Sequence, residues 1–143
     1  MANIAHNSII EYESLPMSTP LFTERVPAGF PSPADSFIEM QLDLNTHLIR
    51  HPAATFFVRV AGDSMIGAGI HSGDILVVDR SLEPTDKKVI IAVINGEFTV
   101  KRLRKLKDQV LLVPENNNYQ PIPVEDGEEF EIWGVVTTVI HPV

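Results

Sequence analysis

The stretch Val89–Leu103 reads VIIAVINGEFTVKRL, and it decides the class of fold. Val89–Ile94 is a continuous apolar run bounded by turn signals, which predicts a strand buried on both faces. Asn95-Gly96 is the strongest short hairpin signal, because both central residues of a type I′ turn need a positive φ. Glu97–Leu103 is therefore predicted to return antiparallel to the first strand.

Working outward, further stretches rich in β-branched and aromatic residues flank this hairpin. They are Thr55–Val60, Ile75–Asp79, Val110–Pro114 and Glu131–Ile140. Several short strands separated by Gly and Pro turns predict a mainly β fold: a compact β domain with one or two short helices. An extended N-terminal arm would precede this domain.

The arm is predicted over residues 1–32 and the β domain over residues 33–143. The first 33 residues hold five prolines, which bar a helix and favour extended backbone. They also carry large apolar residues, so we expect the arm to dock on its own domain or on a second protomer. Ser32-Pro33-Ala34-Asp35 resembles a helix start. Two short helical pieces are predicted to follow as far as Arg50, broken near Asp43.

The composition of the chain limits the classes of function that it can have. The chain has 143 residues, a formal net charge of −8 and 44% apolar residues, enough for one domain plus a tail. So acidic a chain is not expected to bind nucleic acid directly, and any role on DNA would be delegated to a partner. With no cysteine, disulfides, thiolate zinc sites and a Cys nucleophile are excluded. We expect no export signal, no membrane association and a cytoplasmic location.

Two features could carry chemistry, and each has an ordinary structural explanation. Ser64 lies in Gly62-Asp63-Ser64-Met65, where small residues let backbone N–H groups approach a substrate carbonyl, although most such serines belong to turns. Lys101 lies in mid-strand on the face of Thr99 and Leu103. It is also part of a basic run, which is usually a solvated face.

A third feature is the arm segment Val26-Pro27-Ala28-Gly29-Phe30. It is either an ordinary linker or a scissile bond at Ala28–Gly29, because a small, extended and exposed dipeptide fits a narrow cleft.

Other candidates are weaker. His47 and His51 have a spacing that metals use, but without a third ligand we interpret them as surface residues. Asp63 is expected to serve a turn, Glu125–Glu131 to be a solvated turn, and Trp133 to belong to the core. No metal or cofactor is predicted.

Together these motifs resemble the self-cleaving Ser–Lys peptidase family of LexA repressors and UmuD proteins, and within it the UmuD/MucA-like SOS mutagenesis branch. The likeness runs from about Phe30 to Val143, with Ser64 and Lys101 37 positions apart. Besides Ala28-Gly29, the segments that carry it are Phe57–Met65 (FVRVAGDSM), Asp74–Asp79 (DILVVD), Gly96–Leu103 (GEFTVKRL) and Trp133–Val136 (WGVV). The 28 residues ahead of the proposed scissile bond are too few for the helix-turn-helix domain of a repressor, which favours the UmuD branch.

The resemblance implies a function. Ser64 would be the nucleophile and Lys101 the general base, with an oxyanion hole formed by the backbone N–H groups of Ser64 and Met65. They would cut Ala28–Gly29 under stimulation by a RecA–single-stranded DNA filament. The 29–143 fragment would then act as a homodimer with a UmuC-type Y-family translesion polymerase. The alternative is a non-catalytic β adaptor in which the Ser and Lys are incidental.

The chemistry sets one condition on Lys101. A lysine can activate a serine only when its amine is neutral, and at its ordinary pKa it is almost wholly protonated at pH 7. Burial against apolar groups lowers a lysine pKa, so the hairpin around Lys101 must be well packed. Unlike a Ser-His-Asp triad, a Ser–Lys pair needs no carboxylate as a third catalytic residue.

Overall fold

The computed structural model describes residues 18–22, 25–30 and 38–143. The chain divides into two compact units, residues 1–47 and 48–143. In the first unit, strand β1 (Ser18–Phe22) pairs antiparallel with strand β2 (Ile38–Asp43), so that Leu21 faces Met40. The short helix α2 (Leu44–Leu48) follows β2 directly.

The prediction of a helical piece ahead of Asp43 was wrong, because residues 38–43 form strand β2. Apolar Ile38, Met40 and Leu42 alternate with polar residues in this stretch, which is the period of a strand. The strand also finds a partner in β1, from the proline-rich arm where no strand was predicted. The break near Asp43 is real, since α2 begins at the next residue. The predicted helix start at Ser32 lies outside the described residues.

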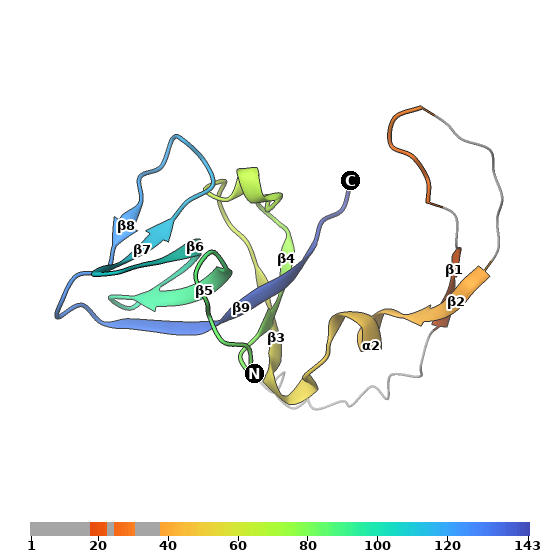
Figure 1. Cartoon of the computed structure of the whole chain (residues 1–143), viewed down its shortest axis with the longest axis horizontal. Coiled ribbons are helices and arrows are strands. Elements are labelled where there is room, and N and C mark those ends of the chain that lie inside the picture. Colours follow the sequence, from red (N-terminus) through yellow and green to blue (C-terminus); the bar gives the residue numbers. More distant parts are fainter. Residues whose placement is uncertain (1–17, 23–24, 31–37) are drawn as a thin grey trace, which may run out of the picture. The chain divides into compact units, whose positions relative to one another are not determined.

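The second unit is built on one seven-stranded antiparallel sheet, which confirms the mainly β fold (Figure 1). Its strands, in spatial order, are β3 (Thr55–Arg59), β4 (Ile75–Asp79), β9 (Phe130–Ile140), β5 (Val89–Ile94), β6 (Glu97–Leu106), β7 (Gln109–Val113) and β8 (Ile122–Pro123). Two 3₁₀ turns flank β3: η1 (Pro52–Ala54) before it and η2 (Ile66–Ala68) after it. The short strand β8 was not predicted.

The β5–β6 hairpin forms as its sequence predicts. Asn95 and Gly96 adopt φ values of 49° and 80°, so both central turn residues have the positive φ of a type I′ turn. Ile91 packs in one buried cluster, whereas its neighbours Ile90 and Ala92 pack in another. Both faces of β5 are therefore buried, and the register places Ile90 opposite Lys101.

Strand β9 lies between β4 and β5 and joins the two halves of the sheet (Figure 1). The register of β9 shifts at Thr137 on the β4 side and at Trp133 on the β5 side. A Cβ at Gly134 would lie 2.6 Å from Val78 Cγ1 and 3.2 Å from the carbonyl oxygen of Asp79. Only glycine lets β9 approach β4 so closely, which explains why the segment Trp133–Val136 contains one.

Among the described residues, no helix combines the length and the apolar character that crossing a bilayer requires.

Candidate active site

Ser64 lies on the loop that follows β3, called here the Ser64 loop (residues 60–69). The loop leaves the sheet where the Val60 N–H donates to the Asp74 carbonyl and the Gly73 N–H donates to the Val60 carbonyl, both at 2.8 Å. Met65, next to Ser64, is only 2% exposed and packs into the buried cluster with Leu76 and Val78. The serine is therefore held at the surface by a neighbour that is anchored in the core.

A second segment, residues 115–119, fixes the other side of this loop. The Glu115 N–H donates to the Ser64 carbonyl and the Gly67 N–H donates to the Glu115 carbonyl, each at 2.8 Å. Asn116 Nδ2 donates to the Asp63 carbonyl at 2.9 Å, and the Tyr119 hydroxyl donates to Asp63 Oδ1 at 2.5 Å. Asp63 thus serves the loop, and its contact raises the pKa of Tyr119.

Lys101 reaches Ser64 from strand β6. Its Nζ lies 3.1 Å from Ser64 Oγ, 2.8 Å from Thr99 Oγ1 and 3.1 Å from the Val100 carbonyl oxygen. The residue is only 9% exposed. The structure therefore brings together two residues that the sequence separates by 37 positions.

The surroundings of Lys101 favour its neutral form. Burial lowers the pKa of this lysine, because desolvation disfavours the charged ammonium. Within the described part of the chain, no carboxylate lies within ion-pair distance of Nζ to oppose this effect. A neutral amine at this position can accept the proton of the Ser64 hydroxyl.

The basic run around Lys101 is not one solvated face. Arg102 Nε donates to Glu115 Oε1 at 2.5 Å, and Arg104 Nε donates to Asp86 Oδ1 at 3.1 Å. Lys101 alone points into the protein, while Lys105 is exposed.

A cleft of about 500 Å³ opens beside the two side chains. Most of its lining is apolar. The lining residues include Ser64, Lys101, Phe56, Val58, Phe98 and Trp133. Such a cleft can hold a short extended segment of chain with its apolar side chains inside.

Trp133 has two roles. It packs against the core, as predicted, and it also lines the cleft. The Phe98 ring lies edge-on to it, with centroids 5.0 Å apart.

The backbone around Ser64 offers two further groups. In the described residues, the N–H groups of Ser64 and Met65 donate to no backbone or side-chain acceptor. Two adjacent free N–H groups beside a hydroxyl can bind the oxygen of a carbonyl that the hydroxyl attacks.

Ala28 and Gly29 lie in the first unit, in the connection between β1 and β2. Both are exposed and sit in a bend of the chain. Their neighbours Val26 and Phe30 are 88% and 92% exposed. A Cβ on Gly29 would meet no atom within 4 Å among the described residues, so the space beside this glycine is open.

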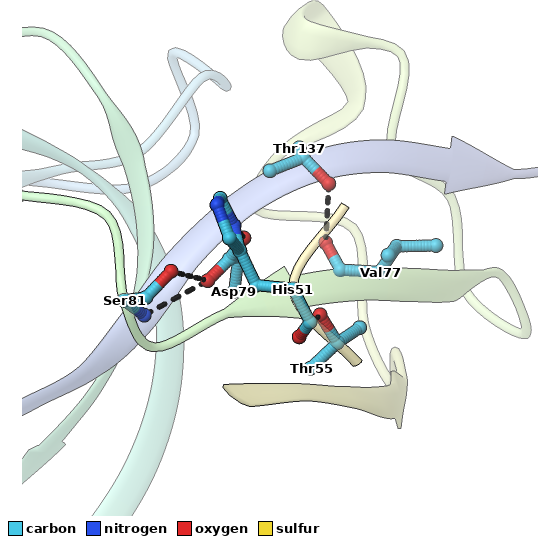
Figure 2. A network of polar contacts seen from close by, with 6 residues as sticks. All are labelled: His51, Thr55, Val77, Asp79, Ser81 and Thr137. Carbon is cyan, nitrogen blue, oxygen red and sulfur yellow. Dashed lines mark hydrogen bonds and ion pairs between the residues drawn. The ribbon is translucent and has the colours of Figure 1, made fainter. Parts of the chain in front are cut away.

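The remaining candidates do not assemble into a second catalytic site. His51 Nδ1 lies 2.6 Å from Asp79 Oδ2, while the Ser81 hydroxyl donates to Asp79 Oδ1 (Figure 2). Asp79 thus separates serine from histidine, whereas a serine triad needs the imidazole in the middle. His47 is exposed. The segment Glu125–Glu131 contains a turn, and in it the Glu128 carboxylate accepts a hydrogen bond from Asn95 Nδ2.

Sequence reasoning missed several residues that shape the site. Thr99 could have been found, since it shares the face of β6 with Lys101 and lies two residues before it. Glu115, Asn116 and Tyr119 gave no local signal, because they contact loop residues that lie far away in the sequence, by up to 56 positions for Tyr119 and Asp63.

Comparison with known proteins identifies the family. The family model described as Peptidase S24-like matches residues 20–137. The chain is 53% identical to protein SamA of Salmonella typhimurium, with 92% of this chain and 91% of SamA covered. It is 46% identical to protein MucA of Escherichia coli, covering 88% of each, and 49% identical to protein ImpA of Shigella flexneri, covering 85% and 83%. The chain therefore belongs to the Peptidase S24-like family.

Proposed function

We propose that this protein is a self-cleaving serine peptidase of SOS mutagenesis, with Ser64 as nucleophile and Lys101 as general base. The observation that carries the proposal is the 3.1 Å separation of Lys101 Nζ from Ser64 Oγ, in a site where the lysine is buried. Activation of a serine by an adjacent base is the arrangement that nucleophilic catalysis requires.

The reaction follows from the groups present. Ser64 Oγ attacks the carbonyl carbon of Ala28 while its proton passes to Lys101 Nζ. The peptide bond breaks as Lys101 returns this proton to the departing Gly29 nitrogen, leaving Ala28 esterified to Ser64. Water, deprotonated by Lys101, then hydrolyses the ester and frees the Ala28 carboxyl group.

The site also contains groups suited to the intermediate. The free N–H groups of Ser64 and Met65 would stabilise the oxyanion that forms at the Ala28 carbonyl. Thr99, whose hydroxyl lies 2.8 Å from Lys101 Nζ, would hold the amine in place through both proton transfers. The exposed bend at Ala28–Gly29 suits a scissile bond, because both residues are exposed and the space beside Gly29 is open among the described residues.

Cleavage would release a working form. The 29–143 fragment would act as a homodimer and as the accessory subunit of a UmuC-type Y-family polymerase, with a RecA–single-stranded DNA filament stimulating the cut in the cytoplasm. The likeness to MucA and ImpA over most of the chain supports this role. The fragment loses three glutamates and one arginine, so its net charge goes from −8 to −6. Contact with DNA would therefore come through its partners.

Two forms of the protein test cleavage and the role with the polymerase separately. Full-length Ser64→Ala should neither cleave itself nor restore damage-induced mutagenesis in cells that lack the native subunit. The 29–143 fragment with Ser64→Ala should restore mutagenesis, because its bond is already absent. If the full-length variant supported mutagenesis as well as the fragment, cleavage would be irrelevant and the non-catalytic adaptor would be the better account.

A further inference from the structure

Three side chains that the proposed peptidase reaction does not use meet at one end of the sheet. Asp74 directly precedes β4, and His141 directly follows β9. The register pairs Ile75 with Ile140, so the sheet places Asp74 beside His141. His71 joins them through a tight turn, in which its backbone N–H donates to Asp74 Oδ2 at 2.7 Å.

Asp74 is the anchor of this cluster. Its side chain is only 2% exposed, although it carries a charge. Burial by itself would raise the pKa of Asp74, but the hydrogen bonds from His141 and from the His71 backbone outweigh it and lower the pKa. The carboxylate is therefore ionised near neutral pH and fixed in one orientation.

Each oxygen of this carboxylate faces one imidazole. His141 Nδ1 lies 2.5 Å from Oδ1, and His71 Nδ1 lies 3.7 Å from Oδ2. The first contact is a hydrogen bond, but the second is too long to be one. The two rings are also close to each other, with centroids 4.7 Å apart, so two protonated imidazoles would repel.

A metal ion bound by both imidazoles and by the carboxylate would explain why these three groups gather at one place. The candidate ligand atoms of the three residues all lie within 4.8 Å of one another. Nitrogen and oxygen ligands about 2.0–2.1 Å from a tetrahedral Zn²⁺ stand about 3.3 Å apart. The two nitrogen–oxygen distances, 2.5 and 3.7 Å, lie on either side of this value. Zinc binding would therefore require the His141 ring to move away from Oδ1 and the His71 ring to move toward Oδ2.

We propose that His71, Asp74 and His141 form a binding site for a divalent transition-metal ion, with Zn²⁺ as its occupant. Two imidazoles and one carboxylate are a ligand set that zinc accepts, with a fourth position left for water. The His71 and His141 side chains are 50% and 41% exposed, so an ion can enter from solvent. Bound zinc would join the C-terminal end of β9 to the turn before β4.

The chain supplies a matched control in His51. This histidine also pairs with a buried aspartate, at 2.6 Å from Asp79 Oδ2, and it is similarly exposed at 51%. The other oxygen of Asp79 accepts from Ser81 rather than facing a second imidazole. His51→Gln thus removes a His–Asp pair without touching the proposed site.

The experiment is calorimetric titration of Zn²⁺ into the full-length Ser64→Ala chain, which is proposed not to cleave itself and is purified without a polyhistidine tag. We expect one saturable site, at least about ten-fold weaker in His71→Gln and in His141→Gln and unchanged in His51→Gln. Zinc should also raise the melting temperature of the parent and of His51→Gln, but not that of the His71→Gln/His141→Gln double variant.

A readout on the parent chain alone is independent of how the variants fold. In NMR spectra, zinc should shift the ring signals of His71 and His141 and leave those of His51 in place. The proposal is overturned if no saturable binding is measured, if His51→Gln weakens binding as much as the other variants do, or if the shifted rings are not His71 and His141. Because none of these measurements uses cleavage, a failure here is distinct from a failure of the peptidase proposal.

Discussion

The backbone N–H of Glu115 donates a 2.8 Å hydrogen bond to the carbonyl oxygen of Ser64. Glu115 returns the contact through its own carbonyl, which accepts from the Gly67 N–H, so Ser64 and Gly67 are both tied to one residue. The position of the Ser64 hydroxyl therefore depends on a segment far away in sequence as well as on its own loop.

Gly67→Ala should disrupt this attachment. A Cβ at Gly67 would lie 2.7 Å from the Glu115 carbonyl oxygen, which is backbone and cannot rotate away. We expect a loss of about 1–3 kcal/mol in the free energy of unfolding, together with a large loss of self-cleavage. Denaturant melts and a cleavage gel measure the two effects. Gly29→Ala is the control for stability, since its Cβ meets no atom within 4 Å. Equal melts for Gly67→Ala and the unaltered chain would contradict the role of this contact.

The lowered pKa of Lys101 should appear in stability as well as in chemistry. Between the pKa of the folded state and the ordinary lysine pKa, the unfolded chain binds the proton that the folded chain has lost. Stability therefore rises with pH over this window. Lys101→Met removes the titrating group and keeps much of its bulk.

We expect the free energy of unfolding of the Ser64→Ala chain to rise with pH relative to that of Ser64→Ala/Lys101→Met, and to level off above the ordinary lysine pKa. Urea melts across the alkaline range measure this difference without interference from cleavage. If the difference in unfolding free energy stayed constant or fell as the pH rose, the pKa of Lys101 would not be lowered in the folded protein.

The pH dependence of the self-cleavage rate should follow the ionisation of a single group. It should increase with pH as Lys101 loses its proton and level off once the amine is neutral, with no second limb that needs a histidine. Band intensities on gels, taken over time at each pH, give the profile. His51→Gln should leave it unchanged, because His51 pairs with Asp79 and not with Ser64. A profile that depended on His51 would identify a different base.

Gly29→Glu should block cleavage while Ser64 and Lys101 remain intact. A large charged side chain next to the scissile bond would crowd an apolar cleft of about 500 Å³. The fold should be unaffected, since Gly29 is exposed and a Cβ there would meet no atom of the described residues within 4 Å. Cleavage gels and melts of Gly29→Glu beside Gly29→Ala measure both points. Unimpaired cleavage of Gly29→Glu would show that another bond is cut.

Local signals predicted the parts of the fold that local physics determines. The run Val89–Ile94 and the turn at Asn95-Gly96 specify the hairpin without help from the rest of the chain, and the hairpin forms as predicted. The same holds for β3, β4, β7 and β9, whose observed bounds differ from the predicted ones by no more than one residue at each end. Strand β1 could not be predicted in this way, because its proline-rich sequence is a strand only through its pairing with β2.

In the candidate site too, local features could be predicted from the sequence and long-range contacts could not. Ser64 and Lys101 each had an ordinary explanation by sequence, and a resemblance was needed to pair them. Contacts across long separations were invisible: Tyr119 with Asp63 is one case, and His141 with Asp74, 67 positions away, is another. In both cases the sheet register and the loop packing bring the groups together, and neither leaves a local pattern.

The most direct test of the central claim is an intact-mass measurement of purified chains after incubation at raised pH. The unaltered protein and Lys105→Met, which changes an exposed lysine of the same strand, should yield a fragment that begins at Gly29. Ser64→Ala, Lys101→Met and the double variant should all stay whole, since residues that act as a unit are lost together. A fragment from Ser64→Ala or from Lys101→Met at the rate of the unaltered chain would contradict the assignment of Ser64 and Lys101 as the catalytic pair.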